Sequence, residues 1–314
     1  MSQEGQLKID LVIPVYNEAG VVEQTYATIA NAIDCLPYKF TIYYIDDGSQ
    51  DRTVHSLDAL AGHDPRIIVL EFARNFGHQA ALTAGLDASN GDFVISLDGD
   101  GQHPPEMIPQ MIALFEQGYD IVQTQRLEEG QGLSFKQLTS SGFYKLINTI
   151  SGTRMEPGAA DFRGLSRQAV EALKSMPEYH RFLRGMISWM GFRSVILPYQ
   201  ETSRVAGKSK YSFGKMFRLA MDAIFSFSLM PLYLGMTAGG ILLCLAAGQI
   251  LYVLSFWLTG RSSELVPGWS SLMSVMLVIG GMVMILLGFI GVYVGYIFQE
   301  VKRRPVYLLK KREK

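Results

Sequence analysis

Short apolar stretches alternate with helical patterns along the first part of the chain. Runs rich in β-branched and aromatic residues, each bounded by a turn-forming cluster, predict strands. These runs are 9–15, 40–46, 66–72, 92–98 and 120–125. Helical periodicity lies between them, near 20–33, 51–61, 78–88 and 105–117. Because apolar strands separated by helices are typical of sheets buried on both faces, we expect an α/β fold with a mostly parallel sheet.

Two longer apolar runs follow, at about 232–258 and 272–298, and neither contains a charged residue. A helix needs about 20 apolar residues to cross a bilayer, so both runs predict transmembrane helices. Seven Lys or Arg residues follow the second run, whereas the connection between the runs has one Arg and one Glu. Basic flanks stay in the cytoplasm. We therefore expect a multi-pass protein of the inner (plasma) membrane with both termini cytoplasmic.

The expected organisation has four parts. They are a cytoplasmic catalytic domain (1–203), a basic amphipathic juxtamembrane segment (204–225), a two-helix membrane hairpin (226–300) and a basic cytoplasmic tail (301–314). The juxtamembrane segment interleaves Lys and Arg with Phe and Met, as interfacial helices do. It either holds a lipid-linked phosphate near the site or is only the basic flank of the first span. Glycines spaced four apart, Gly235 with Gly239 and Gly291 with Gly295, allow subunit contacts or close packing within the hairpin.

Composition excludes several classes of function. The two cysteines, Cys35 and Cys244, offer neither a disulfide framework nor a cysteine metal site. No G-x-G-x-x-G follows the first predicted strand and no P-loop lysine motif occurs, which argues against dinucleotide oxidoreductases and P-loop enzymes. The net charge of −1 gives no indication of nucleic-acid binding.

Polar clusters follow three of the predicted strands, at 14–18, 46–49 and 98–102. Turn and cap chemistry would explain any one of them. Ligands of parallel sheets bind beyond the carboxyl ends of the strands, however, so three clusters at one edge predict a binding site. In the third cluster Asp98 and Asp100 flank Gly99, and the amide oxygen of Gln102 follows. This pattern suits Mg²⁺ or Mn²⁺, which bind carboxylates together with substrate phosphates, as in a nucleotide diphosphate.

Six motifs, in the order PVYNE, IDDGS, RNFGHQAALTAG, DGDGQHPPE, ADFRGLSR and RVAGKSKYS, carry a resemblance over nearly the whole chain, as does the closing YIFQEVKRRPVY. The chain resembles the family 2 glycosyltransferases that charge polyisoprenyl phosphates, including dolichyl-phosphate mannose synthases and bacterial undecaprenyl-phosphate glycosyltransferases. The resemblance implies a GT-A (Rossmann-like) fold and a metal-dependent, inverting hexosyltransferase that is often tetrameric. The expected donor is UDP-glucose, with UDP-N-acetylglucosamine, UDP-galactose and GDP-mannose as alternatives, and the expected acceptor is undecaprenyl phosphate.

The resemblance also implies roles for individual residues. Nucleotide-sugar binding falls to Pro14, Tyr16, Glu18, Asp47, Asp98 and Arg126. The metal ligands are Asp98, Asp100 and Gln102, the catalytic residues are Asp161, Asp100 and Arg204, and the acceptor or phosphate ligands are Lys208, Ser209 and Tyr211. Gly101 departs from the family pattern, which commonly has an apolar residue there.

Asp161 has three open roles: a base, a group that orients the acceptor, or the cap of a helix expected at 165–173. A phosphate monoester has a second pKa of about 6, so the acceptor needs little help from a base. His103 is expected behind the metal ligands, whereas His78, at the start of a predicted helix, either approaches the nucleotide or has no part in the site.

Two other classes of protein remain as alternatives. A processive polysaccharide synthase would need a Q-x-x-R-W segment, for which RFLRG at 181–185 is the nearest string, and a non-catalytic sensor would keep only donor binding.

Overall fold

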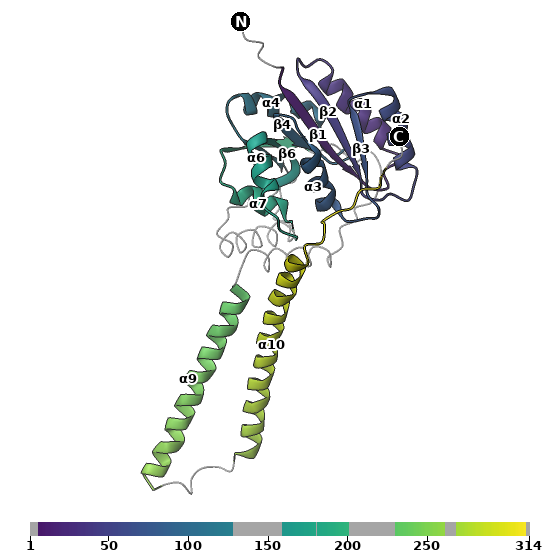
Figure 1. The fold of residues 1–314 in the computed structure, drawn as a ribbon. Coiled ribbons are helices and arrows are strands. Elements are labelled where there is room, and N and C mark those ends of the chain that lie inside the picture. The colour runs from purple at the N-terminus through teal and green to yellow at the C-terminus, as the bar shows by residue number, and fades with distance from the viewer. Residues whose placement is uncertain (1–5, 128–158, 180, 201–229, 261–267, 312–314) are drawn as a thin grey trace. The chain divides into compact units, whose positions relative to one another are not determined.

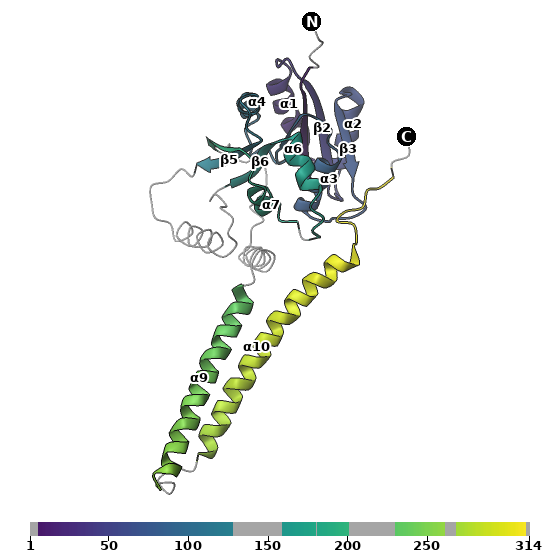
Figure 2. The same ribbon diagram turned by 60° about the vertical axis from the view of Figure 1, so that its left-hand side comes forward.

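The computed structural model describes residues 6–127, 159–179, 181–200, 230–260 and 268–311 (Figures 1 and 2). The chain divides into two compact units. One comprises Met1–Tyr211 together with Arg304–Lys314, and the other comprises Ser212–Arg303. The first unit therefore contains both ends of the chain, and each unit is described by itself.

A seven-stranded sheet with the order β3-β2-β1-β4-β6-β5-β7 forms the centre of the first unit. Its strands are β1 (Lys8–Val15), β2 (Lys39–Asp46), β3 (Ile67–Glu71), β4 (Phe93–Ser96), β5 (Ile121–Leu127), β6 (Ala159–Ser166) and β7 (Ser194–Gln200). Only β6 runs antiparallel to its neighbours. The predicted mostly parallel sheet is confirmed, and its five expected strands are present. Strands β6 and β7 were not expected from the sequence.

Helices cover both faces of this sheet (Figures 1 and 2). One face carries α1 (Val22–Ile33), α2 (Thr53–His63), the 3-10 turn η1 (Pro105–Met107) and α4 (Ile108–Glu116), and the other carries α3 (His78–Ala88), α6 (Arg167–Lys174) and α7 (Leu183–Trp189). Strand β1 is buried from both sides: Leu11 belongs to the same core cluster as Ile29 of α1, whereas Val12 faces α3. Helix α3 comes close because a Cβ at Gly85 would lie 2.3 Å from Cγ1 of Val12.

The direction of β6 decides what meets at the edge of the sheet. The turns that follow β1, β2 and β4 lie at the carboxyl ends of neighbouring parallel strands. Because β6 is antiparallel to β4, with Ser96 paired to Arg163, the beginning of β6 lies beside the end of β4. Asp161, near the start of β6, is thereby brought to the edge that also carries Asp98.

The second unit contains α9 (Met230–Leu258) and α10 (Trp269–Lys302), which coincide with the two predicted apolar segments. Within the described residues, one stretch, Val278–Lys302 of α10, is long and apolar enough to cross a membrane. The helices pack closely at Gly235, where a Cβ would meet the side chain of Leu286. A Cβ at Gly239, Gly291 or Gly295 would have no described neighbour within 4 Å, so packing within the hairpin accounts for Gly235 alone.

Candidate active site

The turns after β1 and β2 interlock through backbone and side-chain hydrogen bonds. The amide of Asn17 donates to Oγ of Ser49 over 2.9 Å, and the amide of Gln50 donates to Oδ1 of Asn17 over 2.8 Å. Asn17 adopts a left-handed conformation with φ of 54°, which reverses the chain between two partly buried residues, Tyr16 and Glu18. Pro14, Tyr16 and Glu18 therefore lie next to the turn that carries Asp47, and their role in nucleotide binding stays a prediction.

Asp47 holds the loop that leads from β3 into α3. Its carboxylate accepts the amides of Phe76 at 2.7 Å and Gly77 at 3.0 Å. Burial raises the pKa of Asp47, and these two hydrogen bonds oppose the rise. A Cβ at Gly48 would lie 2.5 Å from the backbone carbon of Arg74, so only glycine lets the loop approach this turn. The Asp47 carboxylate is thus bound by two backbone amides of the protein itself. These hydrogen bonds hold it beside the residues that are expected to bind the nucleotide.

The acidic loop after β4 lies directly against the end of β1. A Cβ at Gly99 would be 2.5 Å from Cγ1 of Val15, so the spacer between the two carboxylates must be glycine. Asp100 accepts the amide of Gln102 over 3.1 Å. Gly101 has φ of +76°, a conformation that glycine adopts without strain. The departure from the family pattern at this position therefore fits the local backbone.

His103 supports Asp98 from behind. Its ring is buried and stacks on Phe162, with ring centroids 5.1 Å apart. The Asp98 amide donates to Nδ1 over 2.9 Å, so the proton of the neutral ring is on Nε2, which lies 3.8 Å from Oδ2 of Asp98. His103 thus contacts both the backbone and the carboxylate of Asp98, which agrees with the expected place behind the metal ligands.

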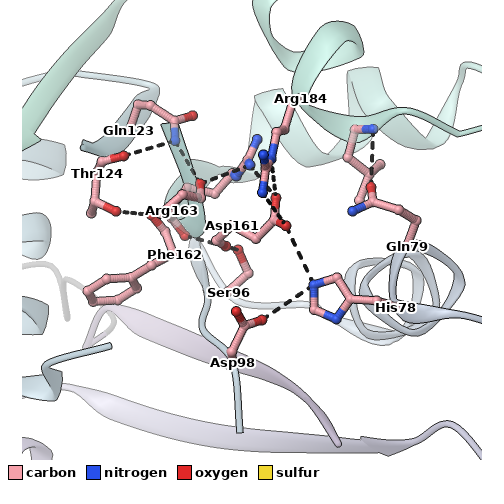
Figure 3. Close-up of polar contacts among 12 residues, drawn as sticks. His78, Gln79, Ser96, Asp98, Gln123, Thr124, Asp161, Phe162, Arg163 and Arg184 are labelled. Atoms are coloured by element: carbon pink, nitrogen blue, oxygen red, sulfur yellow. Dashed lines mark hydrogen bonds and ion pairs between the residues drawn. The ribbon is translucent and has the colours of Figure 1, made fainter. Parts of the chain in front are cut away.

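Asp161 lies among three cationic or partly cationic side chains (Figure 3). Arg184 of α7 binds it through two contacts, Nε to Oδ1 at 3.0 Å and Nη2 to Oδ2 at 2.9 Å. Arg163, two residues along β6, places Nη2 2.7 Å from Oδ1. Nε2 of His78 lies 3.6 Å from Oδ2 of Asp161 and 3.3 Å from Oδ1 of Asp98, so His78 stands between the two carboxylates.

These contacts set the charge of Asp161. Burial alone would raise its pKa, but Arg184, the hydrogen bond with His78 and Arg163 outweigh burial and hold the pKa of Asp161 well below its ordinary value. Burial lowers the pKa of Arg163 to about 10, so that side chain is still a cation at neutral pH. Desolvation would lower the pKa of His78, but Asp161 and Asp98 raise it above the ordinary value. Asp161 is therefore ionised and neutralised by the protein, which makes it a poor proton acceptor.

The site combines an acidic loop with an adjacent cluster in which two guanidinium groups surround one carboxylate. That combination suits a ligand with several phosphate groups. The guanidinium groups can bind one part of such a ligand, and a cation held at the acidic loop can bind another. The family model for glycosyl transferase family 2 matches residues 10–174, which include the two interlocked turns, the acidic loop and Asp161. The chain belongs to glycosyl transferase family 2.

Relatives within this family are similar over almost their whole length. The SfII prophage-derived bactoprenol glucosyl transferase of Shigella flexneri is 39% identical over 97% of this chain and 98% of its own. A prophage bactoprenol glucosyl transferase homolog of Escherichia coli (strain K12) is 38% identical over 98% and 100%, respectively. The uncharacterized glycosyltransferase YkcC of Bacillus subtilis (strain 168) is 35% identical over 97% and 94%. The expected membership in the polyisoprenyl-phosphate type of family 2 is thereby confirmed.

A solved structure supports the fold. Mannosyl-3-phosphoglycerate synthase from Rubrobacter xylanophilus superposes with a TM-score of 0.50 and 17% identity, over 69% of this chain and 72% of that one. This likeness bears on the fold alone, and it agrees with the expected GT-A-like architecture.

The expected metal ligands of this family 2 chain have suitable chemistry. Within the described residues, no group of three or more His, Cys, Asp or Glu side chains could hold a metal ion. Asp98 and Asp100 supply two carboxylates, and Gln102 supplies an amide oxygen. Oδ1 of Asp98 is buried without a hydrogen bond, and its neighbour is the His78 ring. Two carboxylates and one amide oxygen fit a hard cation that takes its remaining ligands from water and phosphate.

The remaining predictions for site residues have different outcomes. Arg126 is exposed near the end of β5, and Arg204, Lys208, Ser209 and Tyr211 lie outside the described residues. The proposed cap role of Asp161 is wrong, because the N-cap of α6 is Ser166, whose side chain accepts the amide of Ala169.

Arg163 and Arg184 were not expected in the site. Strand periodicity places Arg163 on the same face as Asp161, whereas nothing local indicates Arg184.

Proposed function

We propose that this chain is a membrane-anchored, inverting glycosyltransferase that moves glucose from UDP-glucose onto undecaprenyl phosphate at the cytoplasmic face. The observation that carries this proposal is the 39% identity to a bactoprenol glucosyl transferase over 97% of the chain. That span includes the acidic loop, the Asp161 cluster and both long helices. The product would be a lipid-phosphate-linked sugar that serves envelope glycosylation.

The donor is assigned to the interlocked turns. Pro14, Tyr16 and Glu18 would contact the base and ribose, and Arg126 would contact a phosphate. Asp98, Asp100 and Gln102 would hold Mg²⁺ or Mn²⁺. The cation, when bound, supplies positive charge to the diphosphate as it leaves. His103 keeps Asp98 in place for this task through the 2.9 Å hydrogen bond to its amide.

The acceptor phosphate is assigned to the cationic side of the site. An oxygen of the phosphate forms a bond to the anomeric carbon while the bond from that carbon to the UDP oxygen breaks, and UDP takes the bonding electrons. One displacement inverts the anomeric configuration. The phosphate is mostly dianionic at neutral pH, so no protein group must remove a proton.

Asp161 then acts as a positioning residue. Its carboxylate holds the guanidinium of Arg184 through two parallel contacts, a geometry that fixes the orientation as well as the distance. Arg184 is 29% exposed, so part of the side chain is accessible to an incoming phosphate. Arg204, Lys208, Ser209 and Tyr211 would add further phosphate contacts from the segment at 204–225.

The second unit supports the proposed membrane attachment. Many large apolar side chains of α9 and α10 are exposed, among them Leu245, Leu258, Met284 and Val301. Exposed apolar surface of this extent needs a lipid or protein partner. Two crossings, with 226–300 as the hairpin and 301–314 as a basic tail, would return the chain to the cytoplasm beside the domain at 1–203. A homo-oligomer, with a tetramer as the expected form, stays a prediction.

The experiment is a donor screen on the purified full-length protein in detergent. Labelled UDP-glucose, UDP-N-acetylglucosamine, UDP-galactose and GDP-mannose are each incubated with undecaprenyl phosphate and Mg²⁺ or Mn²⁺, and labelled lipid is measured. We expect labelled lipid with UDP-glucose and a metal, and none with EDTA. Labelled lipid with another donor would change the sugar, whereas donor binding without transfer would assign the chain as a sensor.

A further inference from the structure

The segment after α10 returns to the first unit and docks against the end of β3. The docked tail, defined here as Arg304–Lys311, belongs to the same compact unit as the sheet. Leu309 forms an antiparallel bridge with Phe72, immediately after β3. The amide of Ala73 donates to the carbonyl of Leu308 over 2.9 Å, and the amide of Lys310 donates to the carbonyl of Glu71 over 2.8 Å. Since β3 is the outermost strand, the docked tail extends this edge of the sheet.

Tyr307 is the centre of this contact. Its ring stacks on the fully buried ring of Phe72, with the centroids 5.3 Å apart and the planes 8° from parallel. Its hydroxyl donates to Oδ2 of Asp87, close to the end of α3, over 3.1 Å. Burial, together with Asp87, raises the pKa of Tyr307 to about 12, so the phenol keeps the proton that this hydrogen bond needs. One side chain thus bridges the end of β3 and the far end of α3.

The segment between these two contacts leads into the site. Phe72 also packs edge-on against Phe76, 5.6 Å between centroids. The amides of Phe76 and Gly77 are the ones held by the Asp47 carboxylate, and the next residue is His78, which stands between Asp98 and Asp161. The docked tail therefore contacts both ends of the segment that carries His78.

Helix α3 is held by apolar packing along its length and by polar contacts near its two ends. Its buried residues are mostly small, with two larger side chains among them: Ala80, Ala81, Leu82, Thr83, Ala84, Gly85 and Leu86. Small side chains bring a helix close to a sheet but interdigitate less than large ones do. Polar contacts, from Asp47 at the beginning of the helix and from Tyr307 through Asp87 near its end, add to the restraint on its position.

We propose that Tyr307 is a positioning residue for the glycosyl transfer reaction, which fixes α3 and thereby the place of His78 between the two carboxylates. This inference rests on the proposed function. It assigns the docked tail a part in catalysis that is separate from the two membrane crossings before it.

The test compares two Tyr→Phe substitutions in the full-length protein. Tyr307→Phe removes the hydroxyl that reaches Asp87 and keeps the ring. Tyr38→Phe is the matched control, because the Tyr38 hydroxyl also donates to a carboxylate, that of Glu116 at 2.9 Å, but lies before β2 at the opposite edge of the sheet. We expect Tyr307→Phe to lower kcat about threefold to tenfold, the range that corresponds to the loss of one ordinary hydrogen bond. The KM for UDP-glucose and the kcat of Tyr38→Phe should stay near the parent values.

Two further measurements separate positioning from other roles. The kcat should fall equally with undecaprenyl phosphate in vesicles and with a short-chain, water-soluble polyprenyl phosphate. Amide hydrogen exchange of 72–78 should be faster in Tyr307→Phe than in Tyr38→Phe, and deletion of 305–314 should enlarge both effects. A loss confined to the vesicle-bound acceptor would assign the tail to membrane tethering and overturn the proposal, as would equal kcat and equal exchange in the two Phe variants. An inactive parent protein would instead refute the proposed function, while the exchange measurement would still report on docking.

Discussion

Asp98 and Asp161 lie at the same edge of the sheet and share His78 as a neighbour, yet their surroundings differ. Asp98 is 33% exposed in its loop, and two histidine rings, those of His78 and His103, lie 3.3 and 3.8 Å from its carboxylate oxygens. Asp161 is 9% exposed and binds two guanidinium groups at 2.7 to 3.0 Å. The protein therefore neutralises one carboxylate by itself and leaves the other able to attract an external cation. This contrast supports two proposals made above, that a cation binds at Asp98 and that Asp161 is a positioning residue.

The largest expected effect comes from the loop of Asp98. Asp98→Asn and Asp100→Asn each remove a charged oxygen that would bind the cation, so we expect kcat to fall about a hundredfold to a thousandfold, a range typical for loss of a preorganised electrostatic group. The metal concentration for half-maximal activity should rise. Both quantities are measured by titrating Mn²⁺ in the transfer assay.

Asp92→Asn is the control for these substitutions, because Asp92 directly precedes β4 and its carboxylate accepts the backbone amide of Lys8 over 2.9 Å. Its activity should stay near that of the parent. If Asp98→Asn depended on metal as the parent does, the cation would not bind at this loop. The proposed contrast between Asp98 and Asp161 would then be wrong.

The second prediction concerns Asp161. If it positions Arg184, Asp161→Asn and Arg184→Ala should each lower kcat/KM for the acceptor by about tenfold to a hundredfold, since each breaks a buried, doubly bonded ion pair. The low pKa of Asp161 means that its carboxylate stays ionised from pH 5 to pH 9. The acid limb of the pH profile should therefore follow the acceptor phosphate, with a pKa of about 6, in the parent and in Asp161→Asn alike. Loss of that limb in Asp161→Asn would restore the base hypothesis.

These two carboxylates also differ in how far the sequence reveals them. The pair Asp98 and Asp100 follows an apolar strand with glycine between them, so its place at the carboxyl end of a parallel sheet could be predicted from local pattern. The charge state of Asp161 could not. It depends on β6, which the sequence did not indicate as a strand, and on Arg184, which comes from a helix more than twenty residues away.

The fold shows the same division. Five strands and the helices between them were predicted because each has a local periodicity, and the apolar segments of α9 and α10 were evident from composition. The antiparallel direction of β6 and the return of the tail to β3 are long-range pairings, and such pairings depend on which edges are free in the folded sheet. The tail at 301–314 was predicted as a basic flank because positive charge dominates its composition. The docked tail, Arg304–Lys311, is held by the side chain of Tyr307 and by backbone hydrogen bonds to the end of β3.

A smaller effect is expected at His103. His103→Phe keeps the stacking on Phe162 but leaves the buried Asp98 amide without its acceptor, so kcat should fall about tenfold. His103→Asn offers an oxygen close to the place of Nδ1 and should recover part of the loss. The assay is the same transfer reaction, at saturating metal. Equal activity of His103→Phe and the parent would mean that Asp98 needs no support from this side.

The smallest effect on catalysis, and the sharpest control for the contrast, is expected at Asp64. This carboxylate also has a low pKa, about 2, because hydrogen bonds from Arg66 and Tyr26 outweigh the rise that burial causes. Asp64 precedes β3 at the opposite edge of the sheet from the site. Its unfolded pKa is about 3.9, so its contribution to stability, roughly 2 kcal/mol, is complete above pH 4 and is lost as the pH falls toward 2. Asp64→Asn should lower the thermal midpoint at pH 7, the difference from the parent should shrink toward pH 2, and kcat should not change. A large loss of kcat in Asp64→Asn would mean that breaking an arginine–carboxylate pair far from the site lowers kcat as well. A loss of activity in Asp161→Asn would then no longer support a positioning role for Asp161.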